Sequence, residues 1–421
     1  MEYKRTELAD NIGFSSIIDE KFKTSSISIR FITPLGAQTA AANALGIGAL
    51  SSSSSEYTTL AALNEKLSSL YGAGLSSFAR KRGDVQILGL GASWIANRYA
   101  IDEEDIEGEM LGIVRDCLFR PNAKGGEFDA ESFAITKKDL LDRIDAELNN
   151  KRGFALARAA ETAFTGEPAE NSCYGTKETA SAVGAAEAFR AYERLLRTAQ
   201  VEIFFVSPQE NPKAAELLRE SFSEIDRSPE TVTFRNKSPL RDNIVTAQDE
   251  FDVRQCKMVL TFKSDSDDTF AMKMLSTIFG ETPVSKLFMN VREKMSLCYY
   301  CACRTVASKG ALMVDIGAER SNLEKAKAEI LHQLDEIKNG SISDEELESA
   351  ITSIENALCQ VGDTPSSYAG WYFERFCDGA IRTPQEQLLD YKSVTKARIV
   401  QAANSIKLDS IYLMLNKEVQ E

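Results

Sequence analysis

The sequence contains the same order of predicted elements twice, and this repetition restricts the possible folds more than any other feature. In the first half, a strand at residues 27–33 precedes helical segments, and another strand follows at residues 84–90. In the second half, a strand at residues 258–262 precedes a helical segment, and strands follow at residues 298–306 and 311–316. A plan that recurs across 421 residues indicates two homologous domains rather than one large core.

A polar connector separates the two halves at residues 226–240. Hydrophobic periodicity stops there, and Pro229 and Pro239 stand among serines and charged residues, as is typical of a loop. We therefore expect an N-terminal domain over residues 1–225 and a C-terminal domain over residues 241–421. Because the strands cluster between pairs of helices, we predict the α+β class, each half being a mainly antiparallel sheet with helices packed on one face.

The charge of the chain argues against two classes of partner. The formal net charge is −14, which disfavours both nucleic acid and an anionic membrane surface. No apolar run approaches the roughly 20 residues that span a bilayer. The first ten residues are polar and lack the apolar core of a secretory signal. We expect a cytoplasmic protein.

Three of the eight cysteines cluster, at Cys298, Cys301 and Cys303. A C-x-x-C pair indicates a zinc or redox site when a second ligand pair lies at a suitable distance, and the sequence has no such second pair. The segment is rich in strand-forming residues, so alternation would place Cys301 and Cys303 on one face and Cys298 on the other. We interpret the three as packed strand residues.

Four local segments, in their order and spacing, resemble the pitrilysin/insulinase family of zinc peptidases. They are the Pro-Leu-Gly at residues 34–36, the Ser-Ser-Glu-Tyr at residues 54–57, and the segments at residues 67–73 and 288–299. The resemblance covers essentially the whole chain. It implies two similar α+β halves that form a half-clam and pair with a second chain, as in the bacterial subfamily with one active and one inactive-looking partner.

The catalytic signature of that family is absent from this chain. In H-x-x-E-H, two histidines on one helical face bind Zn²⁺ and the glutamate polarises the attacking water. Ala44 and Gly48 stand here at the histidine positions and Ile47 at the glutamate position, while the implied third ligand falls near Arg143. Since His332 is the only histidine, the chain cannot form a two-histidine motif anywhere. The resemblance therefore implies a chain without a metal or other cofactor of its own.

The resemblance also implies a functional pair in the second half, Arg292 and Tyr299. The family uses an arginine and a tyrosine seven residues apart to bind the peptide backbone and stabilise the oxyanion, which suits a fixed cation and a phenolic donor. The alternative interpretation is an ion-paired arginine at a helix end and a tyrosine packed in a strand.

Two hypotheses for the function follow. In the first, the chain is the non-catalytic subunit of a heterodimeric peptidase, in which an H-x-x-E-H homologue holds the zinc and Arg292 and Tyr299 assist in trans. In the second, it is a stand-alone peptide-binding or scaffold protein, alone or as a homodimer. A third, cysteine-based hydrolysis, needs a base near the thiol. His332, the only histidine, lies about 200° from Ile330 around its helix and therefore points to solvent. This position argues against His332 as the base.

Overall fold

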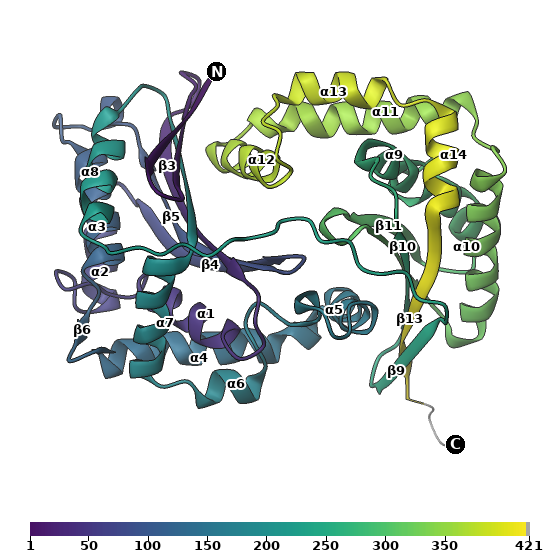
Figure 1. The fold of residues 1–421 in the computed structure, drawn as a ribbon, viewed down its shortest axis with the longest axis horizontal. Helices are drawn as coiled ribbons and strands as arrows, with labels where there is room; N and C mark the ends of the chain where they lie inside the picture. Colours follow the sequence, from purple (N-terminus) through teal and green to yellow (C-terminus); the bar gives the residue numbers. More distant parts are fainter. Residues whose placement is uncertain (418–421) are drawn as a thin grey trace. The chain divides into compact units, whose positions relative to one another are not determined.

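The computed structural model describes residues 1–417, which form two compact units, each with its own sheet (Figure 1). The first unit comprises Met1–Ala146, Asn171–Thr233 and Val361–Ala380. The second comprises Glu147–Glu170, Phe234–Gln360 and the residues from 381 onward. Residues 226–244 contain no helix or strand.

The first unit is organised around a six-stranded sheet of order β1-β2-β8-β3-β5-β4. Only β2 and β8 are parallel to each other, and the remaining pairs are antiparallel. The strands are β1 (Glu2–Ala9), β2 (Ile12–Ile18), β3 (Thr24–Pro34), β4 (Gly74–Arg82), β5 (Val85–Ile95) and β8 (Gln200–Ser207). A short ribbon joins β6 (Ala123–Lys124) to β7 (Glu127–Phe128).

Helices cover both faces of this sheet, and the alternation of side chains along β3 shows why. Ile29 and Phe31 belong to the main core with residues of the helices, whereas Arg30 lies on the other face against a phenylalanine of α12. The helices are α1 (Ala40–Ala49), α2 (Leu60–Ser69), α3 (Ile106–Phe119), α4 (Ala130–Ala146), α6 (Lys177–Ala182), α7 (Ala185–Thr198), α8 (Pro212–Ser223) and α12 (Pro365–Cys377).

The second unit is organised around a five-stranded sheet of order β11-β12-β10-β13-β9, in which only β9 and β13 are parallel. Its strands are β9 (Val245–Phe251), β10 (Cys256–Ser264), β11 (Tyr300–Val306), β12 (Ala311–Ala318) and β13 (Ile406–Asn416). Its helices are α5 (Lys151–Ala163), α9 (Thr269–Gly280), the π-helix η4 (Leu287–Lys294), α10 (Leu323–Lys338), α11 (Asp344–Cys359), α13 (Pro384–Lys392) and α14 (Lys396–Ser405).

The two sheets repeat one topology. The order β2-β8-β3-β5-β4 in the first corresponds strand by strand to β9-β13-β10-β12-β11 in the second, with the same parallel and antiparallel relations. β1 is an addition that the second sheet lacks. The predicted α+β class with two mainly antiparallel sheets is therefore confirmed, but each sheet carries helices on both faces rather than on the one face predicted, because α12 and α5 cover the second face.

One helix in each unit comes from the other side of the connector. α5 precedes the connector but packs on the second sheet, where Ala155 and Ala159 belong to one core cluster with Val259 and Met313. α12 follows the connector but packs on β3 and β8 of the first sheet. Figure 1 shows each of these helices on the sheet face opposite the other helices of its unit. The ranges 1–225 and 241–421 remain a prediction about the sequence repeat, whereas the packed units also include these exchanged segments.

Candidate functional site

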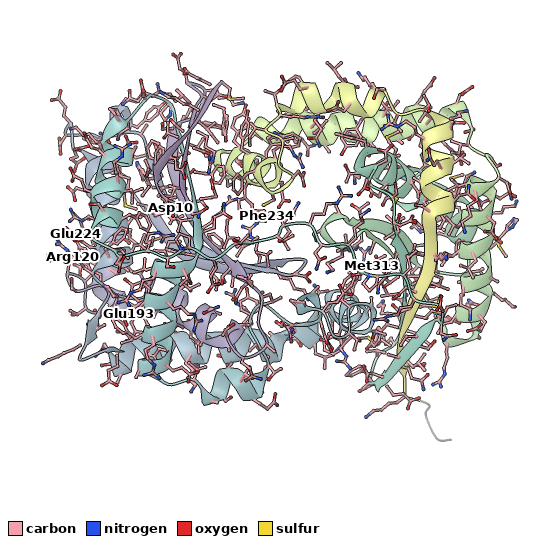
Figure 2. The ribbon with its side chains drawn as sticks, viewed as in Figure 1. Asp10, Arg120, Glu193, Glu224, Phe234 and Met313 are labelled. Carbon is pink, nitrogen blue, oxygen red and sulfur yellow. The ribbon has the colours of Figure 1, made fainter. Side chains whose placement is uncertain are left out.

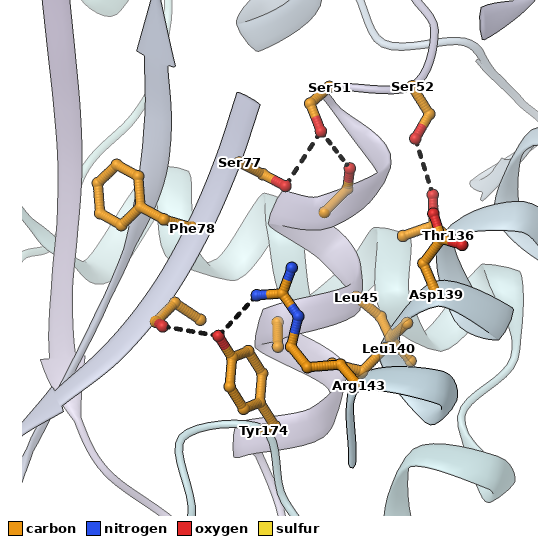
Figure 3. A pocket seen from close by; sticks show the side chains of 13 residues that line it. Leu45, Ser51, Ser52, Ser77, Phe78, Thr136, Asp139, Leu140, Arg143 and Tyr174 are labelled. Carbon is orange, nitrogen blue, oxygen red and sulfur yellow. Dashed lines mark hydrogen bonds between the residues drawn. The ribbon is translucent and has the colours of Figure 1, made fainter. Parts of the chain in front are cut away.

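A pocket of about 130 Å³ lies in the first unit, between α1, α4 and β4 (Figure 3). Its lining includes Ala44 and Gly48 of α1, Arg143 of α4 and Tyr174. Because a water molecule takes about 30 Å³ of liquid volume, the pocket has room for one side-chain head group rather than a large ligand. The structure thus places Ala44, Gly48 and Arg143 around one space. Ile47, by contrast, is buried in the core and does not line the pocket.

Small residues of α1 allow its neighbours to approach closely. A Cβ atom on Gly46 would lie 2.6 Å from the carbonyl oxygen of Ala188 on α7. A Cβ atom on Gly48 would lie 2.9 Å from Cγ2 of Thr136 on α4. Since real Cβ atoms rarely come this close to other atoms, a larger residue at position 48 requires the Thr136 side chain or the two helices to shift.

Arg143 places a fixed positive charge in the pocket. Its Nη1 donates a hydrogen bond of 2.9 Å to the Tyr174 hydroxyl, which in turn donates to the carbonyl oxygen of Ala79 at 3.0 Å. The guanidinium also stacks near the Tyr174 ring, 5.4 Å from its centroid. These contacts orient the side chain toward the lining of the pocket, as Figure 3 shows.

The other polar groups of the pocket are largely hydroxyls that bind one another. Ser51 bonds to the Ser77 hydroxyl at 3.0 Å, and Ser52 bonds to the Thr136 hydroxyl at 3.0 Å. Asp139 is the only carboxylate in the lining, and the lining has no imidazole or thiol. Zinc sites use three or four nitrogen, sulfur or carboxylate ligands. The residues present therefore do not fit a zinc ion, and residues 1–417 contain no group of three or more His, Cys, Asp or Glu side chains that could hold a metal ion.

The strand beside the pocket lies at the edge of its sheet. β4 pairs only with β5, and its residues Ser77, Phe78 and Ala79 line the pocket. The unpaired N–H and C=O groups of an edge strand can bind an extended peptide as an additional strand. A peptide bound in this way would run along the mouth of the pocket.

Arg292 and Tyr299 lie in the second unit. The Arg292 guanidinium lies 4.6 Å from the centroid of the Phe288 ring and 3.6 Å from a carboxylate oxygen of Glu293. Tyr299 lies just before β11, its N–H donates to the Gly317 carbonyl at 2.9 Å, and the residue is 61% exposed. Within residues 1–417 no hydrogen bond or ring contact joins the Arg292 and Tyr299 side chains. The phenol is therefore available to another molecule.

The three clustered cysteines are all buried. A hydrogen bond with Cys301, together with the charge of Arg292, lowers the pKa of Cys298, whereas burial raises the pKa of Cys301. Cys298 lies before the strand, and its thiol contacts Cys301 instead of pointing to the opposite face. His332 is exposed on α10, as expected. Cysteine-based hydrolysis therefore lacks a histidine base.

Sequence reasoning missed two features of this region. Tyr174, which orients Arg143, is 31 residues away from it in the sequence, and no motif connects them. The free edge of β4 depends on the strand order, which local patterns do not reveal. Within the described part of the chain, no helix is long and apolar enough to cross a membrane.

Comparison with known proteins agrees with this picture. Residues 183–354 match the family described as "Peptidase M16 inactive domain". The chain is 25% identical over 404 residues to the probable inactive metalloprotease YmfF of Bacillus subtilis, covering 95% of this chain and 94% of that protein. It is 23% identical over 314 residues to an uncharacterized zinc protease of Rickettsia bellii, covering 71% and 72% of the two chains.

Solved structures share the fold over the full length. A conserved protein from Enterococcus faecalis superposes with a TM-score of 0.92 at 23% identity, covering 100% of both chains. The peptidase M16 inactive domain from Pseudomonas fluorescens superposes with a TM-score of 0.80 at 14% identity, also covering 100% of both chains. Together the comparisons confirm the resemblance drawn from the sequence.

Proposed function

We propose, from the premise that this chain is an inactive-type homologue of the M16 (pitrilysin/insulinase) peptidases, that it is the non-catalytic subunit of a heterodimeric zinc peptidase. One observation carries the proposal: the pocket beside the open edge of β4 is lined by Ala44, Gly48 and Arg143 where zinc ligands would be needed. The chain thus retains a surface suited to an extended peptide and lacks the means to hydrolyse it.

In this proposal the two subunits divide the work. An H-x-x-E-H homologue holds the zinc ion and activates the water. This chain binds peptide through strand addition to β4. Its Arg292 and Tyr299 assist the partner's zinc site in trans, at the reacting carbonyl. A guanidinium and a phenol can both donate to the oxygen that becomes negative in the transition state. We place the complex in the cytoplasm.

An exposed Tyr299 does not require a catalytic role, so it is also compatible with a second candidate function. A stand-alone peptide-binding or scaffold protein, monomeric or homodimeric, would use the same β4 edge without any catalytic step. Co-purification with an H-x-x-E-H homologue encoded nearby separates the two candidates, because the scaffold function requires no such partner.

We expect Arg292→Ala and Tyr299→Phe to lower the turnover of the heterodimer by about a hundredfold or more, the usual effect of removing one oxyanion donor. The subunits should remain associated, because each change removes few contacts. The measurement is kcat with a fluorogenic peptide, alongside size-exclusion chromatography of the complex. Lys325→Ala and Tyr99→Phe, which change an exposed cation and an exposed tyrosine elsewhere in the chain, serve as controls. Unchanged kcat in both test variants would contradict the catalytic role and leave the scaffold function.

A further inference from the structure

The second sheet carries a group of cations on the face that α5 covers. Arg152 comes from α5, Lys257 from β10 and Arg304 from β11, and they surround Asp315 of β12. The strand registers pair Lys257 with Gly317 and Arg304 with Met313. Because side chains at positions 313, 315 and 317 point to one face, the three cations and Asp315 share that face.

The single carboxylate of this group is fully occupied. Arg152 Nε donates to Oδ2 of Asp315 at 2.5 Å, and its Nη2 donates to Oδ1 at 3.2 Å. Arg304 Nη2 donates to the same Oδ1 at 3.1 Å. Asp315 is 1% exposed, so it is a buried anion held by two arginines. Within residues 1–417 its ion pairs are with these two arginines, and none joins it to Lys257.

Lys257 has only a neutral hydrogen-bond partner. Its Nζ donates to Oε1 of Gln255, and it forms no ion pair with any residue from 1 to 417. Both Lys257 and Arg152 lie against the ring of Tyr300, at 5.0 and 4.5 Å from the centroid. Burial and the nearby Arg152 lower the pKa of Lys257. The charge of Asp315 acts in the opposite direction but does not outweigh these two causes.

A missing side chain makes this arrangement possible. A Cβ atom on Gly317 would lie 2.4 Å from Cε1 of Tyr300 and 2.9 Å from Nζ of Lys257. Glycine at this position therefore lets the phenol ring and the ammonium group lie directly on the sheet.

The group has a surplus of positive charge that remains accessible. Three cations against one carboxylate leave a local charge of about +2 within a chain of net charge −14. The side chains of Arg152 and Arg304 are 42% and 44% exposed. Each guanidinium has five N–H groups, and the bonds to Asp315 use only some of them. Donors therefore remain for a ligand.

We propose that Arg152, Lys257 and Arg304 form a binding site for a carboxylate of a peptide ligand, either an acidic side chain or the C-terminal carboxylate. The inference rests on the proposed peptide-binding function and adds a substrate class to it, acidic peptides. A carboxylate at this site completes the ion pairing of Lys257 and can accept two parallel hydrogen bonds from an arginine.

The test measures binding of fluorescein-labelled peptides to the intact chain by anisotropy at low ionic strength. Three peptides share one sequence: one has internal glutamates and an amidated C-terminus, one has glutamines and a free C-terminus, and one has glutamines and an amidated C-terminus. We expect at least one carboxylate-bearing peptide to bind about tenfold or more tightly than the neutral peptide. Comparing the two carboxylate-bearing peptides identifies the source of the carboxylate. The preference should weaken at about 0.5 M salt.

Variants connect the preference to the site. Lys257→Gln with Arg304→Gln keeps the Arg152–Asp315 pair and should abolish the preference, whereas Lys257→Arg should retain it. Lys325→Gln, an exposed cation on α10, is the matched control and should change nothing. Equal binding of all three peptides overturns the inference and leaves peptide binding intact. If none of the peptides binds, the peptide-binding function fails and the inference fails with it. A preference that survives the double variant places the carboxylate elsewhere and also overturns the inference.

Discussion

At the scale of single residues, the most unusual environment is that of Arg30, a buried cation. It is 3% exposed on the α12 side of the first sheet, between the rings of Phe204 and Phe373, whose centroids lie 4.8 and 4.3 Å from its guanidinium carbon. Its Nε donates to the Ser28 hydroxyl, while its Nη1 has no hydrogen-bond partner. Burial lowers the pKa of Arg30 to about 9, so the side chain is still charged at neutral pH. Contact with the two rings only partly offsets the cost of burying that charge.

We therefore expect Arg30→Met to leave stability unchanged or to raise it by about 1 kcal/mol or more, because an apolar side chain of similar length fills the space without a buried charge. The contrast variant is Arg5→Met. Arg5 is the ion-pair partner of Glu202, which is fully buried, and its removal should cost about 3–5 kcal/mol. Urea unfolding monitored by circular dichroism measures both effects. A loss of several kcal/mol in Arg30→Met would show that the ring contacts outweigh the burial cost.

At the scale of elements, the approach of α1 to α4 decides the chemistry of the pocket. Gly48 brings the two helices close together, and Arg143 extends from α4 into the same space. Both features oppose a metal ion, the first because a side chain on position 48 would meet Thr136 and the second because Arg143 is positively charged.

Restoring histidines alone should therefore fail to restore zinc binding. We expect Ala44→His with Gly48→His to bind zinc weakly, because Arg143 remains and Thr136 obstructs position 48. Adding Arg143→Glu supplies a third ligand and removes the cation, so zinc affinity should rise tenfold or more. Isothermal titration with zinc measures the affinities, and the unaltered chain is the reference. Tight binding by the double variant would show that Arg143 does not oppose the metal.

At the scale of the whole molecule, each unit contains a helix from the other half of the sequence. α5 precedes the connector and belongs to the second unit, and α12 follows the connector and belongs to the first. Ala155 and Ala159 of α5 complete the core of the second unit, and Phe373 of α12 covers Arg30 in the first. Neither half of the chain therefore contains a complete unit.

We expect the separate fragments 1–233 and 234–421 to fail to fold cooperatively, since each lacks a helix that covers one face of its sheet. Co-expressed, the fragments should assemble, and an intact chain cut at an inserted protease site after residue 233 should remain together. Size-exclusion chromatography and thermal melting measure these outcomes. Cooperative melting of either fragment alone would mean that the exchanged helix is dispensable.

Local patterns in the sequence were enough to predict the class of this protein. Alternation at Ile27, Ile29 and Phe31 predicted a strand, the recurrence of the plan predicted two sheets, and a single histidine excluded the zinc motif. These conclusions hold without the tertiary structure because strand and helix periods are properties of adjacent residues, and because no fold can supply a missing side chain.

Tertiary structure alone decided which sheet each helix covers and which charges meet. α5 has an apolar face, but its sequence does not say which sheet that face packs against, because the choice depends on contacts across the connector. Arg152, Lys257, Arg304 and Asp315 come from four elements up to 163 residues apart, and only the strand register places them on one face. The charge surplus that they form therefore exists only in the folded chain, since in the extended chain solvent and distance separate the four groups.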